Sequence, residues 1–139
     1  MSLGMRNIVR ITVVLILDFL GGCSFPNPAT TGNWIFKLTP SGSSEVILAT
    51  ANLTQNGNVI TGHAALSGNG VGCGVATSMM ASGSVQGNNL TLQFTEAQNI
   101  VTFTGTANQS FTFLTGTYLE TGGSCLPDGG VGSWSATLQ

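Results

Sequence analysis

Charged side chains are scarce in this sequence of 139 residues: they make up 6% of it, against about 25% in an ordinary soluble domain. Three basic residues, five acidic residues and one histidine leave a formal net charge of −2 at pH 7. Nucleic-acid binding needs a basic surface that neutralises phosphates, so this composition excludes nucleic acid as a partner. It also leaves little material for acid–base catalysis, and we predict no enzyme, no catalytic residue and no cofactor.

Residues that bind metals are equally few. The sequence has three cysteines, Cys23, Cys73 and Cys125, and a single histidine, His63. Neither a CxxC nor an HxxxH spacing accompanies them, so we predict no metal site.

Long apolar runs are missing too, and the most apolar stretch, near the amino terminus, is short. It runs from Ile11 to Leu17 behind Arg6 and Arg10, whereas a membrane span needs about 20 residues. A positive segment followed by a short apolar run is typical of an export signal. We therefore predict a signal helix in residues 1–22, with an ordinary secretory signal or a buried core helix as the alternatives to the type described next.

The residues that end this segment, Leu20-Gly21-Gly22-Cys23, resemble the lipobox of bacterial lipoproteins, whose pattern is Leu, a small residue, Gly or Ala, then Cys. The resemblance implies cleavage before Cys23 and attachment of a diacylglycerol to its sulfur. Several acyl chains, each contributing about 0.8 kcal/mol per buried CH₂, make a stable anchor in a membrane of the bacterial cell envelope. Ser24 stands where many lipoproteins of the inner membrane have Asp, which favours the outer membrane.

Residues 23–31 contain two prolines and no periodic pattern, so we predict a lipidated tether there and one domain over residues 32–139. Export also bears on the other two cysteines. In an oxidising compartment an even pair of cysteines indicates a disulfide, and we predict a Cys73–Cys125 bond between two glycine-rich loops.

Beyond the signal, the sequence consists of short β-prone runs separated by Gly and Asn, and no window has the spacing of apolar residues typical of a helix. Leu90 to Thr95 alternates apolar and polar residues, as a half-buried strand does. Asn56-Gly57-Asn58 and Gly87-Asn88-Asn89 supply residues that tolerate the positive φ of tight hairpins. The predicted fold class is all-β, an antiparallel up-and-down meander of about eight strands. They are residues 33–39, 45–55, 59–66, 81–86, 90–96, 100–107, 110–120 and 132–138.

A weak repeat of hydroxyl, Gly, polar and apolar residues favours closure of this meander. It is centred on Gly62, Gly83, Gly105 and Gly116, and glycine inside a strand marks a bend or a close backbone approach. A chance coincidence of abundant Gly and Thr is the alternative. The mature chain has one lysine, Lys37, so an open sheet would leave its edges poorly guarded. We predict a small closed barrel in which residues 33–38 pair with residues 133–138.

Gly32-Asn33-Trp34 and Gly132-Ser133-Trp134 open the first and the last predicted strands. Closure makes these strands neighbours, and we expect the two tryptophans to plug one end. The Gly-x-Trp start, with Leu-Thr-Gly-x-Tyr at 114–118, resembles the avidin and lipocalin-type barrels in layout. That resemblance implies room for a small ligand, although avidin's biotin site uses several tryptophans and this chain has two. The candidate interior or rim residues are Trp34, Phe36, Phe94, Phe103, Tyr118 and Trp134.

Two function classes follow from these patterns. The first is a non-enzymatic envelope lipoprotein whose barrel binds a small apolar ligand or an envelope protein. The second is a structural or surface-display module without a pocket. An envelope hydrolase is disfavoured, since Glu45, Glu96 and Glu120 are expected to be solvated charges near strand ends. A large internal cavity would favour the first class and a filled barrel the second.

Overall fold

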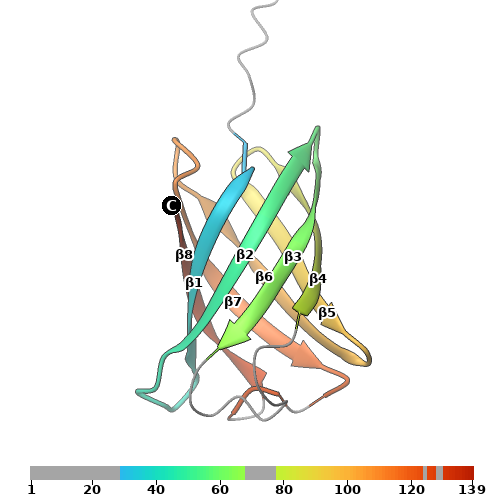
Figure 1. Ribbon diagram of the computed structural model, residues 1–139. Coiled ribbons are helices and arrows are strands. Elements are labelled where there is room, and N and C mark those ends of the chain that lie inside the picture. The colour runs from blue at the N-terminus through green and yellow to red at the C-terminus, as the bar shows by residue number, and fades with distance from the viewer. Residues whose placement is uncertain (1–28, 68–77, 124, 128–129) are drawn as a thin grey trace, which may run out of the picture.

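The computed structural model describes residues 29–67, 78–123, 125–127 and 130–139 of the chain. Eight antiparallel strands form one closed barrel in sequence order (Figure 1). They are β1 (Gly32–Pro40), β2 (Ile47–Asn56), β3 (Val59–Ser67), β4 (Ser78–Gln86), β5 (Asn89–Glu96), β6 (Asn99–Ala107), β7 (Phe113–Thr121) and β8 (Val131–Leu138). The predicted all-β meander is therefore confirmed. The predicted signal, residues 1–22, lies outside the described residues.

The barrel closes through its first and last strands. Trp34 lies opposite Leu138 and Leu38 lies opposite Trp134 in an antiparallel pairing of β1 with β8. The predicted contact between residues 33–38 and 133–138 is thus confirmed. Closure gives every strand of the barrel two hydrogen-bonded neighbours, so none of these strands presents an unpaired edge to another molecule.

Side chains alternate between the barrel interior and its outer wall. In β5, Leu90 and Leu92 are buried, whereas Thr91 between them is exposed. Hydroxyl side chains lie in register on the outer wall from β4 to β8, in a row made of Ser84, Thr91, Thr104, Thr117 and Ser133. The period-two pattern thus puts apolar residues inside and hydroxyl groups outside.

The four glycines of the repeat mark close approaches between strands. A Cβ at Gly62, Gly83, Gly105 or Gly116 would collide with a main-chain oxygen of the neighbouring strand. Only glycine permits this spacing, and each site lets the wall bend as a small barrel requires.

The starts of β7 and β4 differ most from the sequence prediction, and both shifts have local reasons. β7 begins at Phe113 and not at residue 110, because the Asn108 side-chain oxygen accepts hydrogen bonds from the main-chain N–H groups of Thr112 and Phe113, at 2.9 and 3.1 Å. Phe111 in this turn has a φ of 52°. β4 begins three residues before its predicted start, because Met79 and Met80 continue the alternation, one buried and the other exposed.

The barrel has two distinct ends. We call the upper end in Figure 1 the tether end, since β1 starts there, beside the hairpin turns at 57–58 and 87–88 and the loop at 108–112. The lower end is the acidic end, where the β1–β2 loop, the turn at 97–98 and the β7–β8 connection lie.

Candidate functional site

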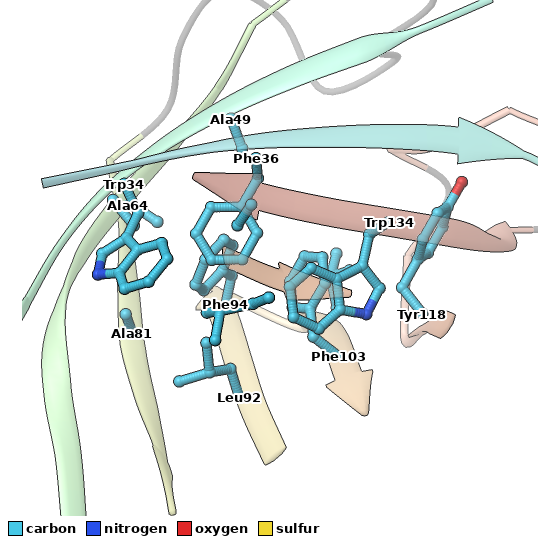
Figure 2. Packing of buried hydrophobic residues seen from close by; sticks show 14 of the residues in the cluster. Trp34, Phe36, Ala49, Ala64, Ala81, Leu92, Phe94, Phe103, Tyr118 and Trp134 are labelled. Atoms are coloured by element: carbon cyan, nitrogen blue, oxygen red, sulfur yellow. The ribbon is translucent and has the colours of Figure 1, made fainter. Parts of the chain in front are cut away.

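The six aromatic residues predicted for the interior or rim all lie inside the barrel, each 3% exposed or less. Figure 2 shows Phe36 within this cluster. Its ring centroid lies 5.2 Å from that of Phe94 and 5.4 Å from that of Trp134. The ring of Phe103 lies 4.7 Å from Phe94 and 5.5 Å from Trp134. These are distances of rings in direct contact. Side chains from β1, β5, β6 and β8 therefore fill the middle of the barrel.

Trp134 owes its place to two glycines of the repeat. Gly105 lies opposite Gly116 in the β6–β7 pair, and Gly116 lies opposite Trp134 in the β7–β8 pair. A Cβ on Gly105 would stand 2.8 Å from the Trp134 indole. The indole Nε1 donates to the carbonyl oxygens of Thr117, at 3.0 Å, and Thr104, at 3.4 Å. The indole thus covers the bare backbone that the glycines leave.

The expectation that both tryptophans plug one end is wrong. β1 and β8 are antiparallel, so residues near the start of each strand lie at different heights of the barrel: Trp34 faces Leu138, and Trp134 faces Leu38. Figure 2 shows Phe36 and Phe94 between the two indoles, with Tyr118 beyond Trp134. The tryptophans therefore lie on two sides of the Phe36 and Phe94 rings.

The tether end is closed by the residues that lead into β1. Thr30 is fully buried, and its carbonyl oxygen accepts a hydrogen bond of 2.7 Å from the Trp34 indole. Gln55 at the end of β2 accepts from the Thr30 main-chain N–H through its side chain, at 2.8 Å. Its own main-chain N–H donates to the Thr31 hydroxyl at 2.9 Å. The chain therefore enters the barrel at a fixed point.

Glu120 is not the solvated charge expected from the sequence. It is 8% exposed, and its two carboxylate oxygens accept from the main-chain N–H groups of Cys125, at 2.6 Å, and Leu126, at 2.9 Å. Leu126 is buried and belongs to the barrel core. Glu120 lies two residues after Tyr118, whose side chain points into the barrel. Because side chains alternate along a strand, this spacing could have predicted that Glu120 also points inward. Its carboxylate holds Cys125 and Leu126, which lie between β7 and β8, at the acidic end.

Sequence reasoning also missed a hollow on the outer wall. It has a volume of about 520 Å³ and spans β1, β2 and β3, with the start of β4 and Gln139 at its margin. Its outward side chains include Ile35, Thr50 and Ala65, which lie side by side on three strands. Asn33, Asn52 and His63 border it, and the Asn52 amide donates to Asn33 at 2.6 Å. Small residues at positions 50 and 65 create this hollow.

The remaining predicted positions fall elsewhere. Cys23 and Cys73 lie outside the described residues, so the lipid anchor and the Cys73–Cys125 bond stay predictions. Cys125 itself is 2% exposed and accepts a hydrogen bond from Asn99. Within the described part of the chain, no three His, Cys, Asp or Glu side chains gather in a metal-binding group, and no helix is long and apolar enough to cross a membrane.

No family model matches the chain, and no curated protein matches it.

Proposed function

We propose that the protein is a lipid-anchored bacterial envelope lipoprotein without catalytic activity, favoured in the outer membrane, whose barrel acts as a rigid module at the membrane surface. The resemblance of Leu20-Gly21-Gly22-Cys23 to a lipobox supports the anchor, and the filled interior supports the rigid module. Of the two classes that the sequence leaves open, a barrel packed with its own side chains supports the structural or display module over an internal ligand carrier.

The packing of the interior supports this choice. Phe36, Phe94 and Phe103 are completely buried and contact one another across the barrel axis. A ligand on this axis would have to displace rings from well-packed positions, and such displacement costs several kcal/mol.

The distribution of ionisable groups supports a non-enzymatic role. Among the described residues, Lys37, Glu45 and His63 are exposed on separate parts of the wall and loops. Glu96, expected to be solvated, is half-buried at the end of β5, and Glu120 accepts hydrogen bonds from two main-chain N–H groups. A general acid or base must reach a substrate and a partner group together. These side chains are placed for solvation and loop capping.

The anchor is tested by a Cys23→Ala variant expressed with a radiolabelled or alkyne-tagged fatty acid. We expect the variant to keep its signal and to lose acyl labelling, whereas the matched control Cys73→Ser keeps the label. Undiminished labelling of the Cys23→Ala protein would contradict the lipoprotein assignment.

The outer-wall hollow supports a second candidate function, the binding of a small apolar molecule with one hydrogen-bonding group. Carbon atoms of Ile35 and Ala65 offer apolar contact, and the amides of Asn33 and Asn52 stand at the border. An NMR titration with indole tests it. We expect saturable shifts at Thr50, Asn52 and His63 that Ala65→Phe abolishes and Thr91→Phe leaves intact. Shifts spread evenly over the wall would contradict a site there.

A further inference from the structure

We propose that the tether end of the barrel lies against the lipid headgroups, while the acidic end points away from the membrane. This orientation rests on the proposed lipid anchor at Cys23. It makes the uncharged hairpins at 57–58 and 87–88 and the loop at 108–112 a membrane-contact surface.

The first observation is where the chain leaves the barrel. Thr30 is buried and hydrogen-bonded to Gln55 and Trp34, so the chain is held to the barrel from Thr30 onward. From Cys23 to Ala29 the chain advances six residues, which span about 20 Å when fully extended. The tether end therefore stays within about 20 Å of the anchoring lipid.

The dimensions of the barrel make the opposite orientation costly. The nine residues of β1 rise about 3.3 Å each and tilt by about 35–45° in a small barrel, giving a height of roughly 20–25 Å. To press the acidic end onto the membrane, the tether would have to run back along this whole height. Full extension would use up its entire length, at a large cost in conformational entropy.

The second observation is the distribution of charge. Of the acidic side chains that the structure describes, Glu45 precedes β2, Glu96 ends β5 and Glu120 lies at the end of β7, all at the acidic end. The turns at the tether end carry no charged side chain. Anionic lipids repel carboxylates over about 8 Å at physiological salt, so they favour the orientation that the tether already imposes.

The third observation is the chemistry of the tether end. Its turns present the exposed amides of Asn58 and Asn88, which can donate to phosphate and ester oxygens of headgroups. The Asn108 amide donates within its own turn, to the hydroxyl groups of Ser110 and Thr112. Val59 and Phe113, exposed at 57% and 44%, flank two of these turns. Apolar side chains are exposed at the acidic end as well, so exposed apolar groups do not distinguish the two ends. The orientation is decided by the charge distribution and by the end at which the tether joins the barrel.

The test uses the lipidated mature protein purified from bacterial membranes and placed in nanodiscs of phosphatidylethanolamine and phosphatidylglycerol. A small fraction of the lipid carries a gadolinium chelate on its headgroup. We expect amide NMR signals of residues 57–58, 87–88 and 108–112 to be broadened several-fold more than those of residues 41–46 and 97–98. Equal broadening, or the reverse gradient, would overturn the orientation while leaving the anchor intact.

Two sets of variants separate electrostatics from tethering. Asn58→Glu combined with Asn88→Glu adds carboxylates to the tether end and should reduce the broadening there several-fold in these discs. The matched control, Ser44→Glu with Gln98→Glu, adds the same charge to the acidic end and should leave the gradient unchanged. An unchanged gradient in the first pair would contradict contact with anionic headgroups. Failure of the unaltered protein to associate with the discs would instead remove the anchor, and with it the proposed function.

Discussion

Phe36 in the first strand stacks on Trp134 in the last, with ring centroids 5.4 Å apart and planes inclined by 26°. This contact joins the two ends of the described chain inside the barrel, next to the β1–β8 pairing that closes it. The ring of Phe36 also meets those of Phe94 and Phe103. Barrel closure and filling of the interior therefore depend on the same side chains.

Replacing Phe36 should destabilise the barrel strongly. Phe36→Ala removes a fully buried ring and leaves a cavity, so we expect the free energy of unfolding to fall by about 3–5 kcal/mol. Urea unfolding of the purified protein measures it. Phe113→Ala is the control, because Phe113 is 44% exposed and its loss should change the free energy by about 0.5 kcal/mol or less. Equal effects of the two variants would contradict the packing described here.

The glycine repeat gives a second prediction. A Cβ on Gly116 would collide with the main-chain oxygen of Thr104 and approach Gly105. Gly116→Ala should therefore lower the free energy of unfolding by about 1–3 kcal/mol, although alanine usually favours regular structure. Thr117→Ala, on the outer wall beside it, should have little effect. A neutral or stabilising Gly116→Ala would show that the β6–β7 contact is looser than described.

The sequence predicted the strands and their closure well because these depend on local patterns. Alternation in Leu90 to Thr95, the hairpin glycines at 57 and 87, and the shortage of edge lysines are all visible without coordinates. The position of Trp134 relative to Trp34 depends on the register and direction of β1 and β8, which local patterns do not show. The antiparallel pairing puts the two tryptophans at different heights of the barrel, and not at one end as expected.

The polar features of the barrel were harder to predict. Glu120 is inside because two main-chain N–H groups from a loop five and six residues later reach its carboxylate. No periodic pattern encodes that loop path. The outer-wall hollow likewise arises from the small side chains of Thr50 and Ala65 on neighbouring strands, and such a pair becomes visible only when the register is known.

Glu120 gives a third prediction. Glu120→Gln keeps the size of the side chain but replaces one acceptor oxygen with a donor N–H₂ that faces a main-chain N–H. We expect the free energy of unfolding to fall by about 1–3 kcal/mol, with faster hydrogen exchange at Cys125 and Leu126. Glu45→Gln, at an exposed loop position, is the control and should change neither quantity. Unaltered exchange in the Glu120 variant would contradict its capping role.

The Cys73–Cys125 pair gives a fourth prediction. Peptide mapping of envelope-derived protein without reductant should find the two residues joined. A bond that closes a loop of about 50 residues stabilises the fold by about 4 kcal/mol in the chain-entropy model, so reduction should lower the melting temperature clearly. Recovery of both thiols in alkylated form from the native protein would refute the pairing.

Native mass spectrometry of the lipidated protein, released gently from bacterial membranes, distinguishes a filled barrel from a ligand carrier. A barrel filled by its own aromatic side chains on an acylated Cys23 predicts one main species, the mature chain from Cys23 plus its covalent lipid. A stoichiometric small molecule that stays bound, and that Ala65→Phe on the outer wall does not displace, would place a ligand inside the barrel and contradict the proposed function.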